Sequence, residues 1–307
     1  MSSLPVIGVD LGGTKLLAGI VGVDGTIHAR AERPTPVGSE EELLHALEEV
    51  VDDLFAGRDV AAVGFGIPST IDRRTGEVVT SVHIPLGGVR LADRMRSRFG
   101  VPIAVDNDGN AATLAEWAIG AGRGTSHMIM LTLGTGIGGG LILGGRLYRG
   151  AVGAGGELGH MIVDHDGPPC GPGCRGHGHF EALASGRTAD GRARELGLAD
   201  ARELVGAARA GDGRAVAALA EIGRAVGAGI ASLVNVFNPE MIVIGGGFAA
   251  AGELILAPAR DVLSREALSP GRDVVRVVLA ELGRDAGLVG AGLAAYEALG
   301  AGSEWTG

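Results

Sequence analysis

A repeated order of strands and glycine turns constrains the fold most. Residues 5–33 read as an apolar run ending in an acid (PVIGVD), a glycine turn (LGGT), a second run (KLLAGIVGV), an Asp-Gly hairpin and a third run (TIHARAER). Residues 127–149 repeat this order as HMIMLTL, GTGIGGG, LIL, a Gly-Gly hairpin and RLYRG. Each copy predicts a meander of three antiparallel strands. Repetition at this period predicts a duplicated domain.

Helices and further strands follow each copy. Ser39, with Glu42 three residues on, predicts the start of a helix that extends to about Phe55. Other helices are expected at 110–119, 213–237, 251–266 and 286–298, and strands at 60–66, 101–107, 241–247 and 274–279. Alternating strands and helices predict an α/β architecture of mixed sheets covered by helices. A chain of 307 residues favours two domains over one domain with insertions.

The charge balance excludes some classes of partner. The net charge is −10, from 26 basic and 36 acidic residues without a basic block, which predicts no nucleic-acid or anionic membrane surface. The chain contains no run of about 18 uninterrupted apolar residues, so no membrane span is predicted. The N-terminus, MSSLPVIGVD, shows no secretory signal. We therefore expect a cytoplasmic protein with small-molecule partners.

Both cysteines and four of the eight histidines lie between residues 156 and 181. They predict a local tetrahedral site of two sulfurs and two nitrogens, for which zinc is best suited; the candidate ligands are Cys170, Cys174, His160, His177 and His179. A disulfide or two inert thiols are the alternatives, but they leave the flanking histidines without a role. A metal site does not require Glu157 and Glu181, at the two ends of the stretch, so these glutamates need another explanation.

Two glycine turns are candidate phosphate loops. DLGGTK, residues 10–15, lies between two strands, where backbone amides can form an anion-binding concavity. LGTG, residues 133–136, is its counterpart in the second copy. A single such turn is more often a plain hairpin, whereas two matched turns favour phosphate binding. Neither turn fits a Walker or a Rossmann pattern.

Two further features bear on nucleotide binding. Lys15 is the only lysine in the chain, which reflects either a bias towards arginine or a need for a flexible ammonium near phosphate. Gly245, Gly246 and Gly247 follow an apolar strand and precede a helix, a placement that would suit the nucleoside end of ATP.

The segment DNDGN, residues 106–110, ends a strand and begins a helix. A capping role is the preferred interpretation for Asp106. Phosphoryl transfer needs amides around the phosphates, a magnesium ion and a carboxylate that takes the proton of the acceptor hydroxyl. Asp108 is the candidate for that carboxylate.

Several ordered motifs together resemble the ROK family of sugar kinases, repressors and uncharacterised open reading frames. The resemblance covers residues 5–298 and rests on DLGGTK, DND, LGTGIGGG, GELGH, the Cys/His cluster ending in Glu181, and VNVFNPEMIVIGGG. It implies a duplicated ribonuclease-H-like (actin-like ATPase) fold with two domains and a cleft between them. The implied domains are residues 1–118, completed by a helix at about 288–307, and residues 119–287 with the zinc loop.

The resemblance also implies roles for individual residues. Asp10 would hold magnesium, and Asp108 would be the catalytic base. The phosphates of ATP would be cradled by Gly12, Gly13 and Thr14 together with Gly134, Thr135 and Gly136. The sugar hydroxyls would be bound by Asn107, Glu157, His160 and Glu181, with His160 also a zinc ligand. The implied cofactors are ATP, Mg²⁺ and a structural Zn²⁺, and the implied assembly is a homodimer or homotetramer.

The chain departs from the family pattern in two places. The usual zinc loop is C-x-C-G-x-x-G-C-x-E, whereas here Cys170 and Cys174 are three residues apart and His179 stands at the last cysteine. Counting back from Glu181 favours His179 over His177 as the fourth ligand, and His177 stays open. His83 replaces an expected asparagine, in a segment VHIPLGG, which leaves the identity of the sugar open.

These features favour an ATP-dependent kinase that phosphorylates a hexose at its 6-hydroxyl, with glucose first. A kinase for another hexose or N-acetylhexosamine (fructose, mannose, N-acetylmannosamine) is the alternative, as is a non-catalytic sugar-binding or sugar-sensing regulator. A DNA-binding repressor is disfavoured, because the first strand starts at about residue 5 and the net charge does not suit DNA.

Overall fold

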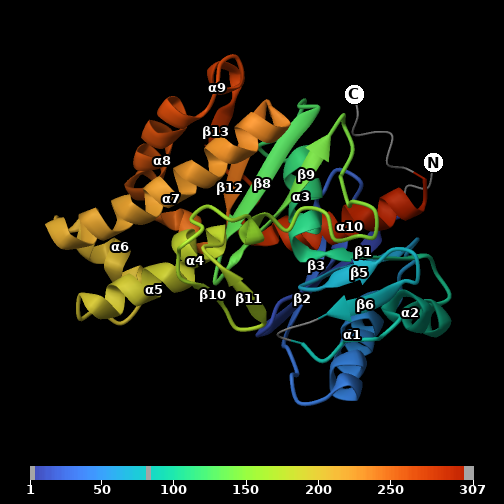
Figure 1. Cartoon of the computed structure of the whole chain (residues 1–307). Coiled ribbons are helices and arrows are strands. Elements are labelled where there is room, and N and C mark those ends of the chain that lie inside the picture. The colour runs from blue at the N-terminus through green and yellow to red at the C-terminus, as the bar shows by residue number, and fades with distance from the viewer. Residues whose placement is uncertain (1–3, 81–83, 301–307) are drawn as a thin grey trace. The chain divides into compact units, whose positions relative to one another are not determined.

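The computed structural model describes residues 4–80 and 84–300 (Figure 1). The chain forms two compact units. Unit 1 comprises residues 1–125, 140–156 and 281–307, and unit 2 comprises residues 126–139 and 157–280. His83, which bears on the identity of the sugar, lies outside the described residues.

Unit 1 is built on a five-stranded sheet of order β3-β2-β1-β4-β7. Its strands are β1 (Val6–Leu11), β2 (Lys15–Val21), β3 (Ile27–Pro34), β4 (Val63–Ile67) and β7 (Ile103–Asn107). The first three strands form the predicted antiparallel meander, and β4 and β7 add in parallel to β1. A hairpin of β5 (Thr70–Asp72) and β6 (Glu77–Thr80) follows β4. The central strand β1 therefore ends at the first glycine turn.

Period-two alternation along β1 separates the two faces of this sheet. Ile7 and Val9 belong to the apolar core beneath α1 (Glu40–Phe55) and α2 (Leu91–Phe99). On the opposite face, Gly8 lets α10 (Ala286–Ala298) approach, because a Cβ at Gly8 would collide with backbone atoms of that helix. The helices α10 and α3 (Asp108–Ala118) pack against each other. Asp10 shares the Gly8 face, which positions its carboxylate at the start of α10.

Unit 2 carries a four-stranded sheet of order β13-β12-β8-β9. Its strands are β8 (His127–Leu133), β9 (Ile137–Leu143), β12 (Met241–Gly245) and β13 (Arg276–Leu279). The strand β12 runs parallel to both β8 and β13. The second glycine turn joins β8 to β9, and the last residues of β9 belong to unit 1.

Helices and a small hairpin complete unit 2. The helices are α4 (Phe180–Ala184), α5 (Gly186–Glu195), α6 (Ala201–Arg209), α7 (Gly213–Phe237), α8 (Glu253–Glu266) and α9 (Gly271–Val274), with short 3₁₀ turns η1 (Leu158–His160) and η2 (Gly247–Ala251). A third 3₁₀ turn, η3 (Gly283–Asp285), precedes α10 in unit 1. The strands β10 (Pro169–Gly171) and β11 (Cys174–His177) form the hairpin that carries both cysteines.

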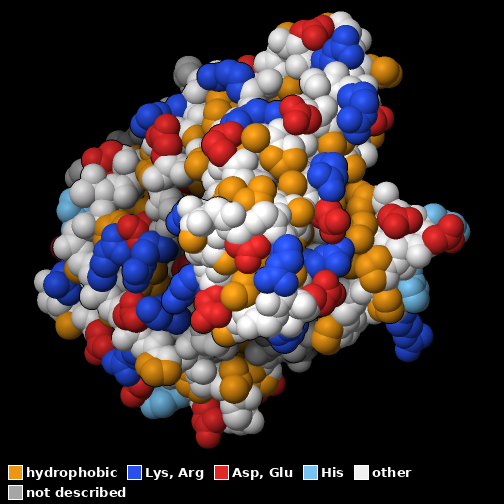
Figure 2. Space-filling model, turned by 90° about the vertical axis from the view of Figure 1, so that its left-hand side faces the viewer, with side chains coloured by type: hydrophobic (Ala, Val, Ile, Leu, Met, Phe, Trp, Pro, Cys, Tyr) orange, Lys and Arg blue, Asp and Glu red, His pale blue; other side chains and the backbone are white. Residues whose placement is uncertain are grey.

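Among the described residues, α7 is the one helix whose length and composition would by themselves suffice to cross a membrane. Half of its most apolar window is buried, and the helix packs closely against α8 and also contacts α6. Charged side chains of both signs are interspersed over the face of the molecule that carries these helices (Figure 2). Charged side chains on the helices of unit 2 form ion pairs, as in Arg192 with Glu221 and Arg260 with Glu253. The helix α7 is therefore arranged as a core helix of unit 2.

The prediction of a third strand in the second copy of the repeat is wrong. The segment after the Gly144-Gly145 turn makes only an isolated bridge, Ile142 with Leu147. Arg149, at its end, instead turns into unit 1 and contacts Asp106 and Glu297. The long side chain gains two ionic partners there, which a strand position would not provide.

Candidate functional site

The first glycine turn in unit 1 is closed by its own backbone. The N–H of Gly12 donates to the carbonyl of Lys15 at 2.9 Å, and the Thr35 hydroxyl donates to the Gly12 carbonyl at 2.7 Å. Gly13, Thr14 and Lys15 are exposed. The predicted phosphate-binding residues of this turn are thus held together at the end of β1.

Two carboxylates interact beside this turn. Asp10 is the penultimate residue of β1, and Asp108 begins α3. Burial, and then the negative charge of Asp108, raise the pKa of Asp10 from 3.8 to about 7. A Cβ at Gly287 would collide with the Asp10 carboxylate, so the first turn of α10 approaches that carboxylate closely. Two partly buried acids that repel each other form a site at which a divalent cation would be stabilised.

The capping role expected for Asp106 is wrong. The N-cap of α3 is Asn107, whose side-chain oxygen accepts from the N–H groups of Gly109 and Asn110. Asp106 is buried and accepts hydrogen bonds from several groups, and we call it and its partners the Asp106 hub. Its Oδ1 accepts from the Asn110 amide at 2.9 Å. Its Oδ2 accepts from Arg149 Nε at 2.5 Å. A cap oxygen must reach the first free N–H groups of the helix, and only the residue directly before Asp108 does so.

Arg149 fixes this hub from a loop of unit 1. Its guanidinium lies between Asp106 and Glu297, at 3.1 Å from the latter. Burial opposes the charge of Arg149, but the two carboxylates raise its pKa above the ordinary value. The ion pair therefore holds the turn that carries Asn107 and Asp108. No motif in the sequence indicates this role of Arg149.

Lys15 is the first residue of β2 and its side chain is exposed. Its ammonium contacts Glu32 Oε1 on β3 at 2.5 Å, and both side chains are about half exposed. Whether this ammonium serves a phosphate stays a prediction.

The second glycine turn, in unit 2, is held by backbone and side-chain groups. The N–H of Gly134 donates to the Gly136 carbonyl at 2.9 Å. From the first turn of α5, the N–H groups of Gly186 and Arg187 donate to the carbonyls of Gly134 and Thr135. Thr135 itself is exposed. The turn presents its predicted phosphate-binding residues from a fixed backbone.

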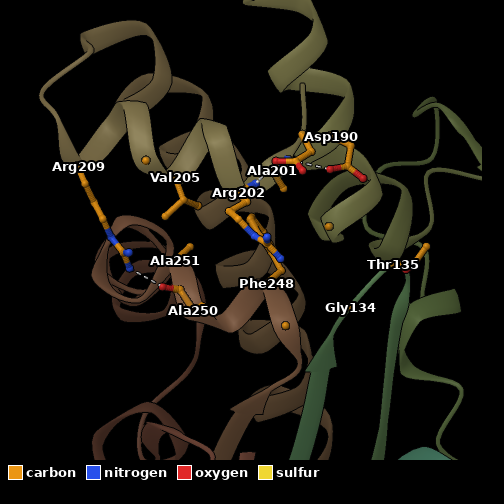
Figure 3. A pocket seen from close by; sticks show the side chains of 14 residues that line it. Gly134, Thr135, Asp190, Ala201, Arg202, Val205, Arg209, Phe248, Ala250 and Ala251 are labelled. Atoms are coloured by element: carbon orange, nitrogen blue, oxygen red, sulfur yellow. Dashed lines mark hydrogen bonds between the residues drawn. The ribbon is translucent and has the colours of Figure 1, made fainter. Parts of the chain in front are cut away.

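A cavity of about 800 Å³ adjoins this turn (Figure 3). Gly134 and Thr135 lie at one side of it, and α6 and η2 supply most of the remaining wall. Gly247 lines the cavity, whereas Gly245 is buried at the end of β12 and Gly246 takes a positive φ of 85° between them. The volume is in the range of a nucleotide-sized ligand.

Several residues of this cavity belong to no motif that the sequence analysis recognised. Arg202 and Phe248 project towards it, and Arg209 is fixed by donating to the Ala250 carbonyl at 2.7 Å. Asp190 accepts from the Ala201 N–H at 2.8 Å. Only the fold brings α5 and α6 against η2, so no local pattern could have indicated these positions.

Four of the five candidate metal ligands meet in unit 2. The ligand atoms of His160, Cys170, Cys174 and His179 all lie within 4.8 Å of one another. The two Nδ1 atoms are 3.2 Å apart, and the sulfur of Cys174 is 3.5 Å from His179 Nδ1. His177 is exposed on β11 and is not a member of this group.

The donor set fits zinc. Two thiols and two imidazoles within one coordination sphere are the set that a tetrahedral zinc site uses. Burial, the Glu181 carboxylate and Cys174 raise the pKa of Cys170 to about 12, so a bound cation would be needed to keep this sulfur as a thiolate at neutral pH.

The two glutamates of this stretch occupy different places. Glu157 is exposed and precedes η1. Glu181, on α4, accepts from the Ile137 N–H at 3.2 Å, and the Cys170 thiol donates to its other oxygen at 3.2 Å. Glu181 therefore touches both the cysteine cluster and the second glycine turn.

Comparison with known proteins gives a consistent result. The family model described as "ROK family" matches residues 6–297. A glucokinase of Thermotoga maritima is 37% identical over 98% of this chain and 100% of its own length. An N-acetylmannosamine kinase of Escherichia coli is 34% identical over 95% of this chain and 98% of its own. A crystal structure of a ROK family glucokinase from Streptomyces griseus, in complex with glucose and AMPPNP, is 37% identical with a TM-score of 0.83, covering 95% of this chain and 99% of that one.

Proposed function

The chain belongs to the ROK family, and we propose that it is an ATP-dependent kinase that phosphorylates a hexose, with glucose preferred, at its 6-hydroxyl. The observation that carries this proposal is the coupled pair Asp10 and Asp108 beside the first glycine turn. A carboxylate pair at a phosphate-binding turn provides what phosphoryl transfer requires of protein groups, namely a cation site and a proton acceptor.

In this mechanism Asp108 takes the proton of the sugar 6-hydroxyl as that oxygen attacks the γ-phosphorus of ATP, and the bond from the γ-phosphorus to the β–γ bridging oxygen breaks, so that ADP leaves. Asp10 would hold Mg²⁺, which would neutralise charge on the phosphates. The amides of Gly12, Gly13 and Thr14 would surround phosphate oxygens, with Lys15 nearby. The Asp106–Arg149 ion pair keeps the turn of Asp108 in place.

We propose that ATP binds to unit 2 through the second glycine turn and the adjoining cavity. Gly134, Thr135 and Gly136 would contact the phosphates. Gly247 lines the cavity that would hold the nucleoside, and Gly245 and Gly246 lead the backbone to it. Two observations support this assignment: the volume of the cavity, and the fact that Gly134 and Gly247 both line it.

Sugar binding is assigned to Asn107, Glu157, His160 and Glu181. The Asn107 oxygen is used by the helix cap, and its Nδ2 donates to the Ser69 carbonyl at 3.5 Å, so the second hydrogen of Nδ2 would serve as the donor to a sugar hydroxyl. Zinc would be held by His160, Cys170, Cys174 and His179. Because His160 directs Nδ1 at the cluster, its Nε2 would serve the sugar. The metal would then be structural and would take no part in proton transfer.

Three further assignments rest on the family resemblance. We propose that the two units correspond to the two domains expected from the sequence, 1–118 with the C-terminal helix and 119–287. We also propose a homodimer or homotetramer, and a cytoplasmic protein.

A substrate panel tests the proposal. Purified protein is incubated with ATP, Mg²⁺ and separate aldohexoses, ketohexoses and N-acetylhexosamines, and ADP release is measured. We expect release with glucose and loss of release in Asp108→Asn, which keeps the size of the side chain but removes the base. ADP release equal to that of Asp108→Asn on every sugar would refute the kinase assignment.

The similarity to an N-acetylmannosamine kinase motivates one alternative substrate class. A higher kcat/KM on N-acetylmannosamine than on glucose in the same panel would establish it. A non-catalytic sugar-binding regulator would instead bind sugar without turnover in a single-turnover assay.

A further inference from the structure

We propose that the Cys/His cluster sets the geometry of the second glycine turn, and thereby the affinity for nucleotide, through Glu181 and the segment His179–Arg187. This inference rests on the proposed function for the identity of the ligand. It assigns Glu181 a positioning role towards the phosphate turn, in addition to any contact with sugar.

Glu181 joins the two sites with one side chain. Its Oε1 accepts from the Cys170 thiol at 3.2 Å, and its Oε2 accepts from the Ile137 N–H at 3.2 Å. A Cβ at Gly136 would collide with Oε2, so the carboxylate presses directly on the turn. A hydrogen bond to a charged acceptor is among the stronger ones in proteins, so this contact restrains the turn effectively.

The same short segment holds the turn from a second side. His179, a proposed metal ligand, occupies the N-cap position of α4, and the chain continues through Glu181 into α5. There, the N–H of Gly186 donates to the Gly134 carbonyl at 2.7 Å. The N–H of Arg187 donates to the Thr135 carbonyl at 3.3 Å. A metal ligand and three donors or acceptors of the turn therefore lie on one continuous segment.

This segment is fixed except at the cluster. Phe180 is fully buried, and its N–H donates to the Met161 carbonyl at 2.8 Å. The Thr188 hydroxyl donates to the Ala182 carbonyl at 3.0 Å, which joins α5 to α4. The start of the segment also makes a backbone bridge between His179 and Ile162, and the hairpin of Cys170 and Cys174 and His160 are groups that a metal would tie to His179.

Loss of the metal can therefore loosen the segment that restrains the second glycine turn. Without the metal, the hairpin and His179 lose their common bond. Cys170 is then a thiol that donates to Glu181 Oε1, as in this structure, but neither its hairpin nor the segment that carries Glu181 is tied to His160 and Cys174 through a shared ion. The turn would then open more often, because local opening follows the loss of the contacts that restrain a segment. The amide of Ile137 reports this opening directly, since its acceptor is Glu181.

Hydrogen exchange of the Ile137 amide and affinity for AMPPNP are the two measurements. Both are made on zinc-loaded protein, on chelated protein and on Glu181→Ala, with bound zinc measured in each sample. We expect faster Ile137 exchange and about tenfold weaker AMPPNP binding in chelated protein and in Glu181→Ala, the effect of losing one charge-assisted hydrogen bond. Glu181→Gln keeps an acceptor for Ile137 and should exchange more slowly than Glu181→Ala. Glu266→Ala, an exposed change on α8, is the matched control.

The following outcomes would contradict the link between the cluster and the turn. Unchanged Ile137 exchange and unchanged AMPPNP affinity in chelated protein would overturn the proposal, as would equal exchange in Glu181→Ala and Glu266→Ala at full zinc content. If Glu181→Ala fails to fold, the comparison of Glu181→Gln and wild type, with and without zinc, decides instead. A protein that binds no AMPPNP in any form would count against the proposed function, and the exchange rates would still test the link.

Discussion

Replacement of Asp10 by Asn should stabilise the magnesium-free protein at pH 8 and leave its stability nearly unchanged near pH 4. In the folded protein the pKa of Asp10 is about 7, against 3.8 for an ordinary aspartate. Between these values the folded state binds more protons than the unfolded state, so the free energy of unfolding falls as pH rises. Above pH 7 the wild-type protein carries the full penalty of the buried charge, which Asn avoids.

The size of the effect follows from the shift. A change from 3.8 to about 7 corresponds to roughly 4 kcal/mol, at about 1.4 kcal/mol per pKa unit. Denaturant unfolding followed by Trp117 fluorescence measures it. Trp117 is buried in unit 1 and its indole N–H donates to the Thr125 carbonyl at 2.7 Å, so it reports on the unit that contains Asp10. The background substitution Trp305→Phe leaves Trp117 as the one tryptophan of the chain.

Two controls separate the effect of burial on the pKa of Asp10 from the effect of the Asp108 charge. Asp108→Asn should reduce the pH slope without abolishing it, because burial is the larger cause of the shift and the Asp108 charge the smaller. Asp24→Asn should not give stability that grows with pH, because hydrogen bonds from Thr26 lower the pKa of Asp24. If the difference in unfolding free energy between Asp10→Asn and wild type is the same at pH 5 and pH 8, the description of Asp10 as a buried acid coupled to Asp108 is wrong.

Three other substitutions test separate parts of the structure. Glu157→Gln should raise the KM for sugar by about tenfold and leave the KM for ATP unchanged, as steady-state kinetics would show; an equal rise in both would assign Glu157 a structural role. Arg149→Met should destabilise unit 1 by about 3 kcal/mol in denaturant unfolding, because it removes the ionic partner of the buried Asp106 and of the partly buried Glu297; unchanged stability would contradict a structural role for these ion pairs. Gly8→Ala should destabilise by about 3 kcal/mol or more because α10 leaves no room for a Cβ, while Gly191→Ala, in open space on α5, should not destabilise. Thermal unfolding of this pair compares them directly.

Local patterns predicted many elements correctly. Ser39 accepts from the Glu42 N–H and begins a helix that ends at Phe55, as the capping pattern predicts. The long helix ends at Phe237 because Asn238 takes a left-handed conformation before a proline. The first meander forms with the expected strands. In each case the signal lies within a few residues, where sequence spacing and backbone geometry are directly related.

Two predictions from the sequence were wrong, and both involve contacts between residues that are distant in the sequence. Asn107, not Asp106, caps α3, and RLYRG forms no third strand because Arg149 binds two carboxylates distant in the sequence. Arg149 there makes partly buried ion pairs that only the folded chain provides, and a local strand pattern carries no information about such partners.

The sequence by itself determined the α/β class and the resemblance that led to the ROK family. It also identified the two glycine turns and the set of sulfur and nitrogen donors, because these depend on residue type and short spacing. Only the tertiary structure decided that His179 joins the cluster, that Asp10 and Asp108 raise one another's energy, and that Glu181 spans cluster and turn. Those facts depend on distances between side chains from separate elements, which packing fixes and local sequence does not.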